Sequence, residues 1–428
     1  MKKALVIGSG AGGATVAKEL QSKFDVTVIE AGNSFHPFSA NLSTIEKIKK
    51  TGALFNEKLI HAIFPAMHIN KTTDGMVLVK GITNGGSTTL SAGNAIRVDR
   101  DLKTLGIDLD AEFNEISKEI PVSAEHRGKW HQTTMQAFEI CRDMQLGPVV
   151  TPKMVDAKRC TGCGKCILGC RQGAKWDSRR YLNQAIKNGA RLISSSKVEK
   201  VMIDNSRATG VVVQNSLRRN FYPADLVVLA AGGFGSPVVL NNSGIRCEDK
   251  LFVDPVLCVA AKIESSRQNA EMPMPFIVQR EDYFISPYFD FLSFFFNRKW
   301  HYHSGDIYSL MIKLGDTNTG SIDRRGVKKS LSELDKASLK DGVKLCKQIF
   351  LRLGIKESEL FLGTINAGHP GGMLPLTGKD ARTFHDTRLP GNLFVADATL
   401  LPRSLGNPPI LTIVAMAKRI SKICLEYA

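Results

Sequence analysis

Four cysteines lie close together in the first half of the chain. They are Cys160, Cys163, Cys166 and Cys170. Thiolates repeated about every third residue can wrap an iron–sulfur cube, which carries one electron at a time. We therefore expect these residues to hold a metal centre, in the first instance a [4Fe-4S] cluster. Structural zinc and metal-free thiols are the alternatives that the spacing leaves open.

This run has the spacing of a bacterial ferredoxin but departs from it at one position. Arg171 follows the last cysteine where ferredoxins usually have Pro, and the chain contains no second run. In two-cluster ferredoxins the fourth cysteine serves the other cluster, so a remote residue such as Cys141 is an alternative ligand to Cys170. Residues 153–180 also hold eight Lys or Arg and two Asp. This basic segment could dock an acidic electron carrier such as ferredoxin, or be a solvated basic face.

A glycine-rich turn near the N-terminus has the residue types that bind a dinucleotide. It follows a predicted buried strand at 3–8 and precedes a second strand at 25–30, which ends in Glu30. The glycines of the turn are Gly8, Gly10, Gly12 and Gly13. They let the backbone approach a pyrophosphate at the helix N-terminus, and the acid can accept hydrogen bonds from a ribose hydroxyl. With strand, helix and acid in order, this region predicts a dinucleotide-binding βαβ unit.

The other elements must position these residues. A buried strand at 225–231, a hairpin at 198–214 and a strand and helix at 392–425 continue the α/β character. The pattern over 111–145 is helical. From about residue 245 to 362 the chain becomes aromatic-rich and then charged and helical, which indicates a second domain.

Composition and charge limit the function further. The 428 residues are 43% hydrophobic and carry a formal net charge of +16, with no run of about 18 apolar residues. We expect neither a signal peptide nor a transmembrane segment, and therefore a cytoplasmic protein that is at most peripheral to a membrane. The basic residues are scattered and no nucleic-acid-binding module is recognisable, so we expect no nucleic-acid partner.

Four separated blocks resemble the glucose-methanol-choline (GMC) oxidoreductase family. The blocks are the N-terminal fingerprint with Glu30, the segment Gly85-Gly86-Ser87-Thr88-Thr89 with Asn94 downstream, the segment at 231–245, and the C-terminal sequences at 368–373, 392–398 and 405–412. The resemblance covers about residues 1–245 and 363–428 and depends on the order of the motifs as well as their letters. The middle segment matches no pattern that we can name.

The resemblance implies a bound FAD and a two-part architecture. We expect a Rossmann-type FAD-binding domain, a doubly wound parallel sheet, built from 1–245 and 363–428, with the cysteine segment inserted at about 150–176. A second, sheet-based α+β substrate domain should comprise 246–362. Many family members join the flavin to a His, but Leu90 occupies that place here, which implies non-covalent FAD. The expected cofactor-binding residues are Gly8, Gly10, Gly12, Gly13, Glu30, Gly85, Gly86, Ser87, Asn94, Val198, Asp397 and Asn407.

The resemblance also assigns catalytic roles. Oxidation of an alcohol by hydride transfer needs a base for the hydroxyl proton and a donor that fixes the oxygen. In the family these are a His and a nearby His or Asn, which correspond to His369 and Asn407. A backbone-bonded turn residue is the alternative for His369. Asp397 ends a strand predicted to be buried, where its carboxylate should meet a ribityl hydroxyl or backbone amides.

Three functions follow from these residues. The first is an FAD-dependent dehydrogenase that oxidises a CH–OH group and passes electrons through an iron–sulfur cluster to an external acceptor. The second is a ferredoxin-fed flavin reductase of a carbonyl or alkene. The third is a non-catalytic flavin and iron–sulfur electron-transfer subunit, against which stands the pair His369 and Asn407.

An aromatic run in the middle segment bears on the substrate. Residues 284–296 contain seven Phe or Tyr. We interpret them as the interior of the second domain, with an apolar substrate pocket as the next alternative and a membrane-inserting surface as the last.

Overall fold

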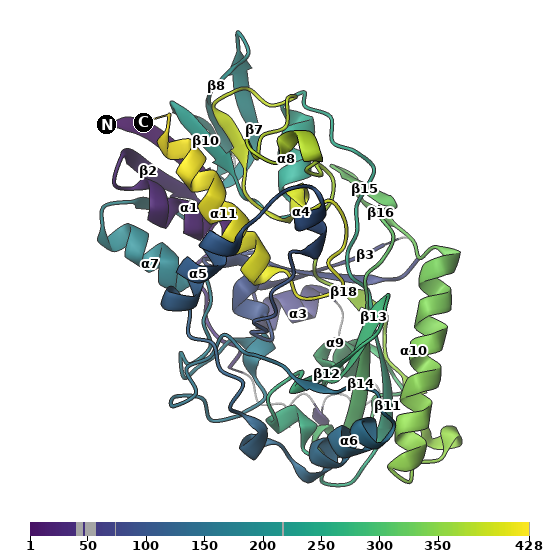
Figure 1. Cartoon of the computed structure of the whole chain (residues 1–428). Coiled ribbons are helices and arrows are strands. Elements are labelled where there is room, and N and C mark those ends of the chain that lie inside the picture. The colour runs from purple at the N-terminus through teal and green to yellow at the C-terminus, as the bar shows by residue number, and fades with distance from the viewer. Residues whose placement is uncertain (40–45, 48–56, 73, 216–217, 428) are drawn as a thin grey trace.

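A computed structural model describes residues 1–39, 46–47, 57–72, 74–215 and 218–427. Two sheets organise these residues (Figure 1). One is a parallel sheet that lies near both termini, and the other is a larger mixed sheet at the opposite end, covered by a long helix. This combination confirms the predicted α/β fold with a second, sheet-based part.

The parallel sheet has the strand order β19, β10, β1, β2, β6. Its strands are β19 (Leu393–Val395), β10 (Leu226–Leu229), β1 (Lys2–Ile7), β2 (Phe24–Ile29) and β6 (Arg191–Ile193), and every neighbouring pair is parallel. The four residues of β10 are all buried. Strands covered on both faces need such continuous apolar runs, which is why 225–231 was recognisable as a buried strand.

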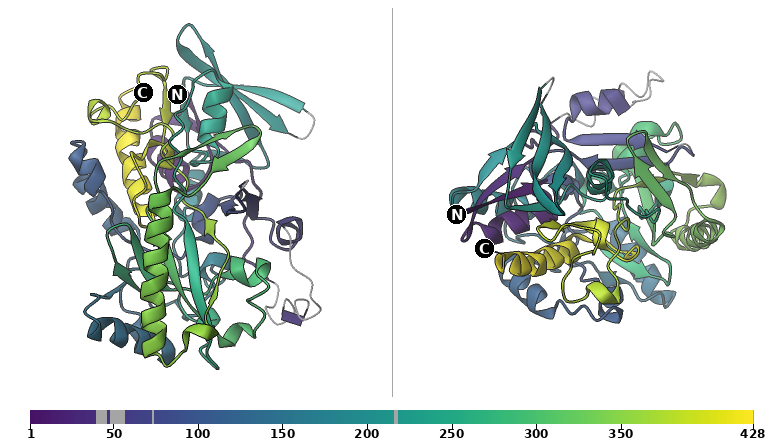
Figure 2. Two further views of the ribbon diagram at one scale, coloured as in Figure 1. Left: turned by 90° about the vertical axis from the view of Figure 1, so that its right-hand side faces the viewer. Right: turned by 90° about the horizontal axis from the view of Figure 1, so that it is seen from above.

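Helices and a small antiparallel sheet flank this layer. Helix α1 (Ala11–Leu20) packs against α7 (Arg179–Lys187) and α11 (Ile410–Leu425), so elements from both ends of the chain meet. The small sheet comprises β7 (Lys197–Asp204), β8 (Arg207–Asn215) and β9 (Arg218–Pro223), and α8 (Ser236–Asn242) packs against β7. These strands extend away from the rest of the molecule (Figure 2). The third strand, β9, was missed in the sequence because five of its six residues are exposed and its first three are Arg, Arg and Asn.

The larger sheet collects strands from distant parts of the chain. Its order is β3 (Met67–Lys71), β4 (Val77–Gly81), β18 (Asn366–Ala367), β11 (Val256–Lys262), β14 (Ile307–Leu314), β13 (Tyr283–Pro287), β12 (Phe276–Gln279) and β5 (Val149–Val150), and β17 (Phe361–Leu362) also pairs with β11. Helix α10 (Glu333–Arg352) packs on β13 and β14. This sheet therefore uses β3, β4, β5 and β18 in addition to the stretch 246–362.

The remaining elements are short. They are α3 (Glu57–Ile63), α4 (Arg100–Thr104), α5 (Asp110–Glu119), α6 (Gln132–Asp143), α9 (Phe291–Phe296), β15 (Gly320–Asp323) and β16 (Gly326–Lys329). The helical pattern predicted over 111–145 corresponds to two helices, because the chain leaves α5 at Ile120, just before Pro121, and α6 begins only at Gln132. Among the described residues, no helix combines the length and the hydrophobicity that crossing a bilayer requires.

The aromatic run at 284–296 is buried between these elements. Part of it forms β13 and part forms α9, whose N-terminus is capped by the Asp290 carboxylate through the amide of Leu292. Phe284, Phe291, Phe294 and Phe295 are each at most 2% exposed. These side chains form one apolar cluster with Trp300, which agrees with the interpretation as a core.

Candidate active site

The glycine turn between β1 and α1 has one closed and one open face. A Cβ atom on Gly12 would lie 1.6 Å from the carbonyl oxygen of Ala396, so Gly12 allows α1 to approach the end of β19. A Cβ on Gly10, at the N-cap of α1, would meet no atom within 4 Å. The open face therefore lies at the helix N-terminus, where backbone amides and the helix dipole attract a phosphate.

Glu30 is buried beside this turn. Its Oε2 accepts hydrogen bonds from the amide and the hydroxyl of Ser9, and its Oε1 accepts one from the amide of Gly32. Burial raises the pKa of Glu30, and these hydrogen bonds oppose the increase. Oε2 is thus fully used, but Oε1 accepts only one of these bonds and keeps a lone pair that can accept a bond from a ribose hydroxyl.

The second glycine cluster lies directly against the first. A Cβ on Gly86 would be 3.0 Å from the Cα atom of Gly10, and the amide of Gly85 donates to the hydroxyl of Ser9 over 3.0 Å. Gly86 begins a 3-10 helix, Gly86–Leu90, in which Ser87 accepts a hydrogen bond from the amide of Gly81. The two predicted cofactor segments are thus brought together.

Two other predicted cofactor residues are engaged by the protein itself. Asn94 is buried, accepts a hydrogen bond from Nζ of Lys153 and donates one to the sulfur of Met274. Val198 is buried in β7 and pairs with Val213. The contacts of these two residues are with other parts of the protein, and they stabilise the fold.

We use the term cofactor cradle for the two glycine clusters, Glu30 and the turn at Gly232 and Gly233 after β10; Asp397 joins this turn to the segment after β19. Its Oδ2 accepts hydrogen bonds from the amide of Gly232 and the hydroxyl of Ser236, and its Oδ1 accepts one from the amide of Thr399. Burial raises the pKa of Asp397 and the hydrogen bonds oppose the increase. The carboxylate therefore fixes the turn at Gly232 against the segment that follows β19.

The turn at Gly232 also contacts the segment that contains His369. A Cβ on Gly233 would lie 2.0 Å from the carbonyl oxygen of Pro370, and one on Gly371 would lie 2.4 Å from the carbonyl oxygen of Ala398. Glycine at both positions therefore permits the His369 segment to approach the cofactor cradle.

His369 combines partial exposure with a charged neighbour. Its side chain is 33% exposed, and its Nδ1 lies 3.3 Å from Oδ2 of Asp254. Loss of surrounding water lowers the pKa of His369; Asp254 opposes this effect and the positive charge of Lys313 adds to it. The ring is therefore neutral near pH 7, as a proton acceptor must be.

Asn407 lies three residues after Ser404, whose hydroxyl donates to the Asp254 carboxylate beside His369. Its Nδ2 donates to Oε1 of Gln279, at the end of β12, over 3.3 Å. Within the described part of the chain, Nδ1 of His369 and Oδ1 of Asn407 have no aligned hydrogen-bond partner. Catalytic hydrogen bonds are often long or misaligned before a ligand binds.

Sequence reasoning missed the residues behind His369. Asp254 accepts a hydrogen bond from the hydroxyl of Ser404, and its Oδ2 lies 2.5 Å from Nζ of Lys313. Ser404 is three residues before Asn407, which was a usable signal. Nothing in the sequence near Asp254 or Lys313 distinguished these residues from ordinary surface charges.

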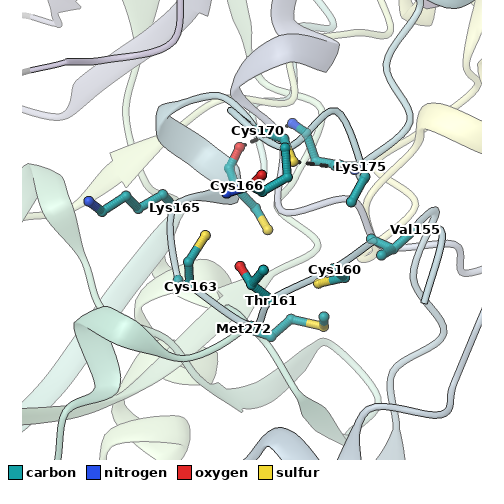
Figure 3. A pocket seen from close by; sticks show the side chains of 13 residues that line it. Val155, Cys160, Thr161, Cys163, Lys165, Cys166, Cys170, Lys175 and Met272 are labelled. Carbon is teal, nitrogen blue, oxygen red and sulfur yellow. Dashed lines mark hydrogen bonds between the residues drawn. The ribbon is translucent and has the colours of Figure 1, made fainter. Parts of the chain in front are cut away.

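The four clustered cysteines line a single small cavity together with Met272 and Lys175 (Figure 3). Cys166 is buried, Cys160 and Cys170 are partly buried, and Cys163 is exposed. Throughout the residues that the structure describes, no three His, Cys, Asp or Glu side chains converge closely enough to form a metal-binding group. The cysteines thus share a cavity, but their sulfur atoms are not arranged as a preformed metal site.

Two buried lysines adjoin this cavity. Nζ of Lys175 donates to the carbonyl oxygens of Thr88, Thr89 and Ser91 over 2.9–3.0 Å and to that of Cys166 over 3.1 Å. Burial lowers the pKa of Lys175 and lowers that of Lys153 to about 7. Lys175 therefore ties the cysteine loop to the 3-10 helix of the second glycine cluster.

Cys141, the alternative ligand, lies elsewhere. It is 1% exposed in an apolar cluster with Trp130 and Phe138, and it does not line the cysteine cavity. Burial raises the pKa of its thiol to about 12. This residue is therefore an unreactive core thiol.

Comparison with known proteins agrees with this arrangement. The family model described as GMC oxidoreductase matches residues 3–257. An uncharacterized protein of Methanocaldococcus jannaschii is 26% identical over 419 residues, which are 97% of each chain. The long-chain-alcohol oxidase FAO4B of Arabidopsis thaliana is 27% identical over 276 residues, 57% of this chain and 34% of that protein.

A solved structure has a similar fold. The crystal structure of pyridoxine 4-oxidase from Mesorbium loti superposes with a TM-score of 0.71 over 99% of each chain, at 13% identity. The open N-terminus of α1, the buried Glu30 and the joined glycine clusters fit a bound FAD. Because the family model spans more than half of the sequence, the chain belongs to the GMC oxidoreductases, a family of FAD-dependent flavoproteins.

Proposed function

We propose that this protein oxidises a CH–OH group, with His369 as the base and Asn407 as the donor that holds the substrate oxygen. The observation that carries the proposal is the position of His369. Its segment packs through Pro370 on Gly233 of the cofactor cradle, while its ring stays partly exposed and neutral. A histidine that served only to close a turn would need neither the exposure nor the buried carboxylate behind it.

Bound FAD would supply the acceptor for the hydride that leaves the substrate carbon. His369 would accept the hydroxyl proton through the ring nitrogen that does not face Asp254. The amide of Asn407 would donate to the same oxygen once Gln279 releases it. Deprotonation of the oxygen and loss of the hydride together convert the alcohol into a carbonyl compound.

The similar proteins favour an alcohol as the substrate. The Arabidopsis relative is named a long-chain-alcohol oxidase, and the similar solved structure is a pyridoxine 4-oxidase. Leu90, in place of a flavin-linking His, supports non-covalent FAD, and it packs against the aromatic cluster that contains Phe284.

Anaerobic reduction of the bound flavin tests this proposal. Primary alcohols of increasing chain length should bleach the flavin absorbance of the wild-type protein. His369→Ala should bind FAD normally but reduce it roughly 10²- to 10⁴-fold more slowly, because general-base catalysis contributes a factor of that size. Reduction at the wild-type rate by His369→Ala would contradict the proposed role of His369.

We also propose that the cysteine loop binds an iron–sulfur cluster. Four thiols line one cavity, the amide of Lys175 donates to the sulfur of Cys170 over 3.4 Å, and two buried lysines adjoin the cavity. Amide donors favour thiolates, and an anionic cluster would in turn favour the charged form of both lysines. Cys160, Cys163, Cys166 and Cys170 would hold the cluster, which would supply one-electron transfer.

An internal cluster would make the protein a dehydrogenase that uses an external one-electron acceptor. The hydrogen bonds of Lys175 to Thr88, Thr89 and Cys166 support this function, because they join the expected flavin segment to the cysteine loop. The basic residues around the loop favour an acidic carrier such as ferredoxin.

A further inference from the structure

A buried charge network lies behind His369 and begins with an unusual backbone. Asp254, just before β11, has φ of +55°, in the left-handed region that non-glycine residues rarely adopt. The carboxylate of Asp316 holds it there by accepting hydrogen bonds from the amides of Val253 and Asp254, over 3.1 and 2.8 Å. Asp316 is in turn paired with Lys329 over 2.7 Å, and both side chains are fully buried.

The side chain of Asp254 is held as firmly as its backbone. It is 1% exposed, and its Oδ2 lies 2.5 Å from Nζ of Lys313, which is 2% exposed. Its Oδ1 accepts a hydrogen bond from the hydroxyl of Ser404. Burial alone would raise the pKa of Asp254, but Lys313 and His369 lower it below the ordinary value. The carboxylate is therefore an anion with a fixed orientation.

One edge of this carboxylate faces the histidine. Oδ2 lies 3.3 Å from Nδ1 of His369, within reach of a hydrogen bond after a small rotation of the ring. The backbone amide of His369 also donates to the carbonyl oxygen of Val253 over 3.2 Å. The two segments are therefore joined through main chain and side chain.

We propose that Asp254 is a positioning residue that fixes the tautomer of His369. With the proton on Nδ1 directed at Asp254, Nε2 is left as the free base. In the oxidation, the substrate O–H proton would move to Nε2, bound FAD would accept the C–H hydrogen with its electron pair, and the C=O bond would form. The resulting imidazolium then lies beside an anion. This inference rests on the proposed function for its catalytic meaning.

Lys313 affects the protonation state of His369. The charged groups that act on His369 in the described chain are Asp254, from the segment before β11, and Lys313, from β14. Loss of surrounding water has the largest effect and lowers the pKa of His369, whereas Asp254 attracts the imidazolium and raises it. The ammonium group offsets part of that attraction, so the ring returns to the neutral state between turnovers.

Nuclear magnetic resonance of the FAD-bound protein tests the inference without any substrate. With ¹⁵N-labelled histidine, and His369→Gln to assign the signal, wild-type His369 should show the tautomer with the proton on Nδ1. Asp254→Asn should lower the pKa of His369, because an anion that stabilises the imidazolium is lost, and should increase the population of the other tautomer. A wild-type His369 protonated on Nε2 would overturn the proposal even if Asp254→Asn does not fold.

Flavin reduction by an alcohol supplies the second readout. Asp254→Asn should retain FAD, reduce it up to about 10⁴-fold more slowly, which is the size of the loss when the orienting carboxylate is replaced in the Ser-His-Asp enzymes, and shift the acidic limb of the pH profile to lower pH. Asp380→Asn is the matched control, since Asp380 is a buried carboxylate that caps the turn at Thr377. It should change thermal stability alone.

The outcomes distinguish the proposed positioning role of Asp254 from the proposed oxidation of an alcohol. If Asp254→Asn lowers only the melting temperature, as the control does, Asp254 is structural and the inference is wrong. If no alcohol reduces the wild-type flavin, the proposed function fails, whereas the tautomer and pKa of His369 still decide whether Asp254 positions it.

Discussion

Gly12 and Ala396 approach so closely that a Cβ atom on Gly12 would lie 1.6 Å from the Ala396 carbonyl oxygen. This contact joins α1, near the N-terminus, to the strand β19 that comes from the C-terminal part of the chain. The cofactor cradle can form only when both parts have folded together.

The contact predicts that substitutions of Gly12 and of Gly10 have different effects. Gly12→Ala should force α1 away from Ala396 and destabilise the protein by about 1–3 kcal/mol or more, as overpacking does. Gly10→Ala should fold normally, because its Cβ would meet no protein atom, but should bind FAD more weakly if Gly10 faces the pyrophosphate. Thermal unfolding of the apoproteins and FAD titration would measure both effects. Equal stability of the two apoproteins would contradict this assignment.

Glu119 predicts a pH dependence of stability. Its carboxylate, at the end of α5, accepts hydrogen bonds from Lys18 in α1, Tyr181 in α7 and Lys418 in α11. Burial alone would raise the pKa of Glu119, but these donors lower it to about 2. Because the folded pKa lies below the unfolded one, this stabilisation is present above about pH 4.5 and is lost as the pH falls toward 2.

Denaturant unfolding between pH 7 and pH 3 would measure this effect. Glu119→Gln should lose roughly 1–2 kcal/mol at pH 7, a figure reduced for partial exposure, and should differ less from wild type at pH 3. Glu125→Gln, which changes an exposed carboxylate in the loop after α5, is the control and should follow wild type. A constant difference between Glu119→Gln and wild type across this range would contradict the linkage.

The cysteine cavity predicts which thiols matter for iron. Protein purified without oxygen should contain about four iron and four sulfide per FAD. Ser in place of Cys160, Cys163, Cys166 or Cys170 should lower the iron content, whereas Cys141→Ala should leave it unchanged, because Cys141 lies in a separate apolar cluster. Elemental analysis and spectra before and after dithionite would decide. Wild-type protein with full FAD and no iron would make the cysteines structural, and bound zinc would identify the other metal.

The sequence predicted the parts of the fold that depend on local pattern. The continuous apolar run at 225–231 predicted β10, and the glycines after β1 predicted the turn, because burial on both faces and close backbone approach each require particular residues. The break between α5 and α6 was missed, since helical periodicity on both sides outweighed the signal of Pro121.

The candidate site was predictable only in part. His369 and Asn407 stand in recognisable motifs, but the network behind His369 comes from three distant segments. Asp254, Lys313 and Ser404 meet only because β11 pairs with β14 and the chain after β19 returns to the same place. Contacts between segments that lie so far apart in the chain produce no periodic pattern in a single sequence.

The central claim is that the flavin oxidises a CH–OH group with His369 as the base. It is tested most directly by anaerobic stopped-flow reduction with an alcohol and with the same alcohol deuterated at the carbinol carbon. We expect slower flavin reduction with the deuterated alcohol in wild-type protein, and loss of most of the rate in His369→Ala with FAD still bound. Equal rates for the two alcohols under conditions where binding is saturated, together with an unchanged rate in His369→Ala, would contradict it.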